Sequence, residues 1–168
     1  MADSHPLLDF RKTEDAEPRV FRFYIALFPI GSGSLCHWGL VLKDSTGATD
    51  MLDVNDLGGS SKHGVRDFGK MRKDHLKIIC EIASVENDEG VSIVRLTAAA
   101  EEIPIYRDSY FCRTWVVNVL GSLRRNGIRL YGEPEMIRKA VQRAAGEFDM
   151  RYDSGYHIVA PHRDRVRR

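Results

Sequence analysis

The segment at residues 36–54, CHWGLVLKDSTGATDMLDV, holds two apolar runs on either side of a short polar stretch. The polar stretch, Asp44–Gly47, consists of residues that favour turns. Apolar, β-branched runs joined by about four turn residues are typical of a β-hairpin. We therefore predict that strands over Trp38–Lys43 and Thr49–Val54 pair antiparallel, and that a helix over 111–126 packs on them.

The remaining elements follow from apolar periodicity and from turn signals. Residues 111–126 predict a helix because their apolar side chains recur every three or four positions. Strands precede helices along the chain, so we predict an α+β fold with an antiparallel sheet of about five strands packed on two main helices. The other predicted elements are strands at Val20–Phe28, Leu76–Ala83 and Tyr156–Val159, a fifth strand or the beginning of a helix at Val91–Leu96, and a second helix from Pro134 to about Phe148.

Residues 57–69 contain four glycines and few apolar side chains. Such a composition is typical of a loop. We expect this segment to be mobile and to cover the entrance of a site.

Length and charge limit the function classes. A chain of 168 residues suits one domain, which we place at 20–160, between a flexible lead-in at 1–19 and a basic tail at 161–168. Twenty-five basic against 24 acidic residues create no overall field that would recruit nucleic acid. No signal peptide or membrane-spanning run is apparent, so we expect a cytoplasmic protein. A protein partner or a homo-oligomer stays open.

Cys112 and His37 are the residues that point to chemistry. Cys112 falls in the first turn of the predicted helix, where the helix dipole and free N–H groups lower the pKa of a thiol. His37 begins a predicted strand and could act as its base. Asp53, in the next strand, could orient the imidazole as the third member of a triad. Asp50 and Asn55 are the alternatives, because the sequence does not fix the register of the hairpin.

The other candidates have mainly structural interpretations. Cys36 neighbours His37 but points to the opposite face of the strand, and Cys80 lies inside an apolar strand. The three cysteines lack metal-ligand spacing, so we predict neither a metal nor a cofactor. Trp38 and Trp115 favour core packing, with the walls of an apolar substrate pocket as the alternative. Arg113 could bind a carboxylate or phosphate.

Two resemblances rest on these residues. The segments His37-Trp38 and Cys112-Arg113-Thr114-Trp115 resemble those of a set of uncharacterised fungal single-domain proteins. Some small proteins of this kind are encoded in natural-product gene clusters. This resemblance implies the handling of a reactive, apolar biosynthetic intermediate. More distantly, the order of His37, Asp53 and Cys112 resembles permuted papain-like proteins of the lecithin–retinol acyltransferase-like group. That resemblance implies acyl transfer or hydrolysis through a thioester, although Phe111 stands where a polar residue usually precedes the nucleophile.

Two functional hypotheses follow from different classes. The first is a cysteine-dependent transferase or hydrolase that acts on a small apolar or peptide-like substrate, with Cys112 as nucleophile, His37 as base and Asp53 as orienting group. The second is a non-covalent pocket protein, similar to a cyclase or isomerase or serving as a partner subunit, which shapes an apolar biosynthetic intermediate. The distance between Cys112 and His37 separates the two hypotheses.

Overall fold

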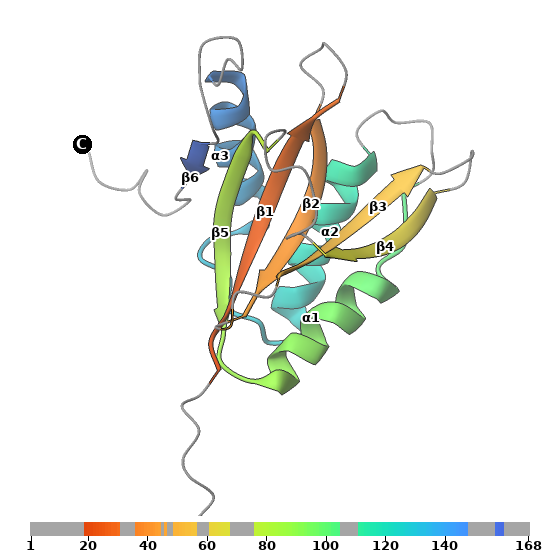
Figure 1. Cartoon of the computed structure of the whole chain (residues 1–168), viewed down its shortest axis with the longest axis vertical. Helices are drawn as coiled ribbons and strands as arrows, with labels where there is room; N and C mark the ends of the chain where they lie inside the picture. The colour runs from red at the N-terminus through yellow and green to blue at the C-terminus, as the bar shows by residue number, and fades with distance from the viewer. Residues whose placement is uncertain are drawn as a thin grey trace, which may run out of the picture.

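The computed structural model describes residues 19–30, 36–44, 46, 49–56, 61–67, 76–104, 111–147 and 157–159. Within them, a six-stranded mixed sheet and three helices form an α+β fold (Figure 1). The predicted lead-in, apart from Arg19, and the basic tail lie outside the described residues. The elements in chain order are β1 (Phe21–Pro29), β2 (Cys36–Lys43), β3 (Thr49–Asp56), β4 (Ser61–Asp67), β5 (Ile78–Val85), α1 (Asp88–Ala100), α2 (Phe111–Arg125), α3 (Pro134–Glu147) and β6 (His157–Val159).

The predicted hairpin forms the middle of the sheet, whose strand order is β4-β3-β2-β1-β5-β6. β2 pairs antiparallel with β1 on one side and with β3 on the other. The turn between β2 and β3 is held by Asp44, whose carboxylate accepts the backbone N–H of Thr46 at 2.9 Å. α2 packs against both strands of the hairpin. These contacts confirm the predicted hairpin and the helix placed on it.

The two edges of the sheet differ from the prediction. β6 pairs parallel to β5, so the sheet is mixed rather than antiparallel. β4 (Ser61–Asp67) occupies the middle of the segment predicted as a mobile loop over 57–69, and it pairs antiparallel with β3. An edge strand needs backbone pairing on one side only, which a polar sequence can supply; Val65 is 69% exposed. The rest of the predicted loop lies outside the described residues.

Residues 88–100 form the helix α1, so the helical alternative for Val91–Leu96 is correct. The side chain of Asn87 caps α1 by accepting the N–H of Gly90 at 2.7 Å. Acidic residues in the first turn complement the helix dipole. Val91, Val94 and Ala98 recur on one face and are buried.

The main core lies between the sheet and the helices. Strand alternation sends one set of side chains toward α2 and α3, and the opposite set forms a smaller cluster on the other face of the sheet. In Figure 1, α2 and α3 lie behind the sheet, and α1 packs beside α2. The buried residues of α2 are Cys112, Trp115, Val116, Val119, Leu120 and Leu123.

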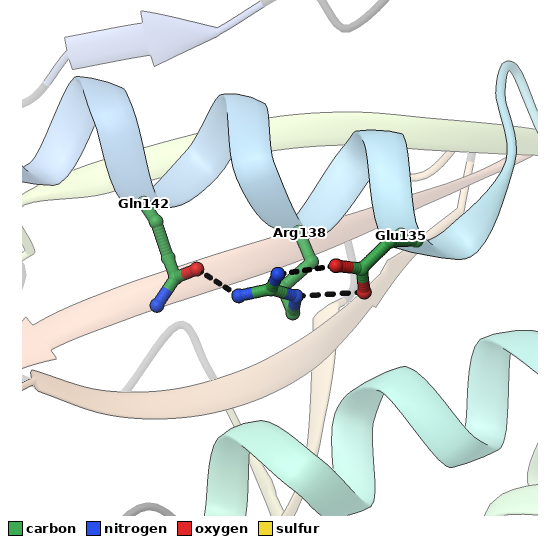
Figure 2. A network of polar contacts seen from close by, with 3 residues as sticks. All are labelled: Glu135, Arg138 and Gln142. Carbon is green, nitrogen blue, oxygen red and sulfur yellow. Dashed lines mark hydrogen bonds and ion pairs between the residues drawn. The ribbon is translucent and has the colours of Figure 1, made fainter.

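α3 carries a polar network along a partly exposed flank (Figure 2). The guanidinium of Arg138 donates to the carboxylate of Glu135 one turn earlier and to the side-chain carbonyl of Gln142 one turn later. Pairs at these spacings support a helix from within. Since all three side chains belong to α3, we assign the network a structural role.

Candidate active site

β2 begins three residues before its pairing with β3. The last register pair between the two strands is Gly39 with Asp53, and beyond it β3 continues in its pairing with β4. Residues 36–38 therefore have β1 on one side and no register partner in β3 on the other. Figure 1 shows these ends of β2 and β3 diverging, with α2 between them in this view.

The thiol of Cys112 lies against the part of β2 that extends beyond its register with β3. Cys112 is the second residue of α2, and its Sγ lies 4.0 Å from the carbonyl oxygen of Cys36. The backbone N–H of Trp38 donates to the same sulfur. Backbone N–H and C=O groups need partners when they are buried. The sulfur thus contacts backbone groups of β2 on the side where, further along β2, β3 pairs.

His37 links this thiol to Asp53. The Nε2 atom of His37 lies 2.8 Å from Oδ2 of Asp53, and the imidazole is also hydrogen-bonded to the thiol of Cys112. Because Asp53 occupies Nε2, Nδ1 is the ring nitrogen that can meet the sulfur. Asp53 is fully buried, whereas the His37 side chain is 19% exposed. The three side chains therefore form a chain from carboxylate to imidazole to thiol.

The register of the hairpin explains this geometry. Gly39, not His37, stands directly opposite Asp53, so His37 and Asp53 are diagonal neighbours on one face of the sheet. A Cβ at Gly39 would lie 2.3 Å from Cε of Met51, so the space beside the pair already holds the methionine.

The electrostatics of the pair favour charge separation. For His37, burial lowers the pKa, but the hydrogen bonds to Asp53 and Cys112 outweigh it and raise the pKa from 6.5 to about 9. For Cys112, burial raises the pKa, but the hydrogen bond to His37 and the backbone N–H groups of Trp38 and Arg113 bring it below the ordinary value of 9.0. Each group thus favours the charged form of the other, as in a thiolate–imidazolium pair.

The first turn of α2 adds backbone donors. The first four N–H groups of a helix have no intrahelical partner and point out of its N-terminus. The N–H of Arg113 is one of them, and it donates to the sulfur of Cys112. An anion that forms next to the sulfur would meet the same set of donors. Ser109, a residue type that favours the N-cap position, lies outside the described residues.

The remaining predicted candidates have other surroundings. The carboxylate of Asp50 pairs with Arg95 at the surface, away from His37, and the side chain of Asn55 lies outside the described part of the chain. Trp38 and Trp115 are 4% and 1% exposed and belong to the main core. Arg113 is half-buried beside Cys112.

The three cysteines differ in their surroundings. Cys80 is fully buried in β5, and burial raises its pKa to about 12. Cys36 is half-buried at the beginning of β2, where it packs against the same core cluster that contains Cys112. Burial raises the pKa of Cys36 as well. Among the three, only Cys112 has surroundings that favour the thiolate.

Two features of the site were not predicted from the sequence. One is the backbone of Cys36 and Trp38, which supplies a carbonyl and an N–H to the sulfur. The other is His63 of β4, whose ring lies 5.9 Å from that of Trp115, and whose Nε2 lies 2.9 Å from the carbonyl oxygen of Glu101. No sequence pattern signals either feature, because the first depends on where the pairing of β3 with β2 ends and the second on the pairing of β4 with β3.

Comparisons of the chain with protein-family models, with curated proteins and with solved structures found no match. In the described ranges, no three His, Cys, Asp or Glu side chains are grouped so that they could hold a metal ion. None of the helices there has the length and apolar character needed to cross a lipid bilayer. Function is therefore inferred from the geometry around Cys112.

Proposed function

We propose that the protein is a cysteine-dependent acyltransferase or hydrolase. The observation that supports this best is the chain of contacts from Asp53 through His37 to Cys112, with the thiol at a helix N-terminus. An orienting group hydrogen-bonded to a base, which is hydrogen-bonded to the nucleophile, is the arrangement that activates a thiol. A merely structural cysteine requires no ionised partner.

The first half of the reaction forms a thioester. The Cys112 thiolate attacks the carbonyl carbon of an ester, thioester or amide, and the carbonyl π electrons move to its oxygen. Free N–H groups in the first turn of α2 stabilise that oxyanion. When the intermediate collapses, the leaving group departs with the proton that the imidazolium of His37 donates.

The second half releases the acyl group. His37, now neutral, removes a proton from water or from an acceptor alcohol or amine, which attacks the thioester carbonyl. The thiolate leaves and the imidazolium is restored, so the pair returns to its initial charge state. Asp53 holds Nε2 throughout and stabilises the positive ring. Water as the acceptor gives hydrolysis, and another nucleophile gives transfer.

An apolar or peptide-like acyl donor suits the surroundings of the thiol. Phe111 precedes Cys112 and is partly buried against the main core, and Trp115 lies one turn further along the helix. An acyl chain next to the sulfur would contact the partly exposed Phe111, while Trp115, which is 1% exposed, supports the helix from within the core. This substrate class agrees with the biosynthetic role that the fungal resemblance implies.

A panel of acyl donors tests the proposal. Hydrolysis of p-nitrophenyl acetate and of p-nitrophenyl hexanoate is measured for the wild type, for Cys112→Ala and for the matched control Cys80→Ala. We expect Cys112→Ala to lose the enzyme-dependent rate by about 10²-fold or more, and Cys80→Ala to stay within about twofold of the wild type. Equal rates in the wild type and in folded Cys112→Ala would exclude the covalent mechanism and favour the non-covalent pocket protein.

A further inference from the structure

Cys36 and Cys112 lie next to each other at the opening between β2 and β3. We propose that this pair is a redox modification site, in which Cys36 resolves oxidised Cys112 as a reversible disulfide. The inference rests on the proposed function, because it gives the nucleophile a protected resting form. It adds a role for Cys36, which takes no part in the acyl-transfer steps.

The geometry supports a bond between these two thiols. The Sγ of Cys112 lies 4.0 Å from the carbonyl oxygen of Cys36. Standard bond lengths then place the sulfur within about 6.4 Å of the Cα of Cys36. Cys36 alternates with His37 and so faces the helix side of the sheet, where it packs against the core cluster that contains Cys112. The two thiols also interact electrostatically. Bond formation therefore requires both cysteine side chains to rotate toward each other, and the end of β2, which has no register partner in β3, is where the backbone can adjust.

The surroundings assign different roles to the two thiols. Cys112 is the one whose thiolate form is favoured by His37 and the backbone, and thiolates react with peroxides. Cys36 is half-buried, and burial and the charge of Cys112 keep it protonated, while the cation of Lys77 acts in the opposite direction. Once Cys112 is oxidised, its charge no longer opposes ionisation of Cys36. Cys36 then becomes the better nucleophile of the two.

The proposed steps use hydrogen peroxide as the oxidant. The Cys112 thiolate attacks one peroxide oxygen, the O–O bond breaks, and hydroxide leaves, so that sulfur loses two electrons and becomes a sulfenic acid. The Cys36 sulfur attacks that sulfur, the S–S bond forms, and the S–O bond breaks with release of hydroxide. The proton on the His37 imidazolium and the thiol proton of Cys36 convert both hydroxides to water. Two thiols and one peroxide thus give one disulfide and two waters, and a dithiol reverses the reaction.

Cys80 offers a matched control within the same chain. It is fully buried in β5, where its Sγ lies 3.9 Å from the carbonyl oxygen of Glu81, and burial raises its pKa to about 12. The protein is treated with excess hydrogen peroxide at neutral pH, because sulfinic acid formation consumes two peroxides per thiol; free thiols are then blocked with iodoacetamide, and a non-reducing digest is read by mass spectrometry. The wild type, Cys36→Ser and Cys80→Ala are compared.

We expect a Cys36–Cys112 cross-linked peptide in the wild type and in Cys80→Ala, and recovery of Cys112 labelling after dithiothreitol. In Cys36→Ser we expect sulfinic acid on Cys112 and no recovery. Sulfinic acid on Cys112 in the wild type, at the same rate as in Cys36→Ser, would overturn the inference, and so would disulfides that join two chains. In those cases Cys112 is still reactive, and the proposed acyl-transfer function stands. A Cys112 that neither oxidises nor alkylates in the folded protein would instead contradict both proposals.

Discussion

Removing the imidazole of His37 should raise the pKa of the Cys112 thiol. The hydrogen bond to His37 is the largest influence that lowers this pKa, and burial, which raises it, would remain in the variant. The backbone N–H groups of Trp38 and Arg113 would then act alone against burial. We expect the thiol of His37→Ala to titrate at or above its ordinary value.

The size of the effect follows from the kind of hydrogen bond that is lost. A hydrogen bond to a charged partner contributes about 1.5–3 kcal/mol. Since about 1.4 kcal/mol corresponds to a factor of ten, the thiolate fraction at pH 7 should fall about tenfold to a hundredfold in His37→Ala. His37→Gln keeps a neutral donor, so its loss should be smaller, about five- to tenfold.

The assay is the rate at which iodoacetamide alkylates Cys112 between pH 5 and 10, read by mass spectrometry of the Cys112 peptide. Only the thiolate reacts, so the rate rises with pH through the pKa of the thiol. The pH midpoint is the quantity to compare, because a small side chain at residue 37 also changes access to Cys112, which is 3% exposed. A change of access scales the whole curve and leaves its midpoint in place.

His63→Ala is the matched control for this experiment. His63 contacts Trp115, one turn of α2 beyond Cys112, and hydrogen-bonds the backbone of residue 101 rather than the thiol. We expect the midpoint of His63→Ala to equal that of the wild type, below pH 9. If His37→Ala and His37→Gln also keep the wild-type midpoint, His37 does not activate the thiol and the reasoning fails.

Two further predictions concern the partner of His37 and the helix that carries Cys112. Asp53→Asn should lower the pKa of His37 by about one pH unit, measured by NMR of the imidazole, because a charged hydrogen bond becomes a neutral one. Asp50→Asn is the control: Asp50 lies on the same strand but pairs with Arg95, so the pKa of His37 should not change. An unchanged pKa of His37 in Asp53→Asn would mean that Asp53 does not stabilise the charged imidazole. Leu120→Ala should lower the free energy of unfolding, measured in urea, by about 2–5 kcal/mol, because the Leu120 side chain of α2 is fully buried in the main core. A loss below about 1 kcal/mol would mean that this side chain does not anchor α2.

The central hairpin and α2 could be predicted because their signals are local. The turn at Asp44–Gly47 follows directly from residue type, and the apolar spacing of α2 is long and regular. α1 was ambiguous because Val91–Leu96 is a short apolar run that fits a strand or a buried helix. The cap at Asn87 and the burial of Val91, Val94 and Ala98 resolve the ambiguity in the structure.

The strand β4 and the parallel pairing of β6, whose strand itself was predicted, could not be derived from the sequence, for a different reason. β4 is polar and pairs through its backbone, so it lacks the apolar alternation that reveals a half-buried strand. β6 has three residues, and its parallel pairing with β5 depends on the path of the chain after α3. Neither property is encoded in residues next to one another in the sequence.

The candidate site was predictable in its residues but not in its geometry. Residue type and position singled out Cys112 and His37, and the hairpin limited the orienting group to a few residues of the next strand. The choice of Asp53 depends on the register that sets Gly39 opposite it. The contacts of the sulfur with the backbone of residues 36 and 38 depend on the divergence of β2 from β3, which is a property of the twisted sheet.

The most direct test of the proposed function is to trap the acyl-enzyme. The protein is mixed with p-nitrophenyl hexanoate, quenched in acid within the first turnover, and analysed by intact mass and by peptide mapping. We predict one hexanoyl group per chain, attached to Cys112 and removed by neutral hydroxylamine as a thioester, with no adduct on Cys112→Ala. Acylation confined to lysines, to Cys36 or to Cys80, or an equal adduct on Cys112→Ala, would contradict the assignment of Cys112 as the nucleophile.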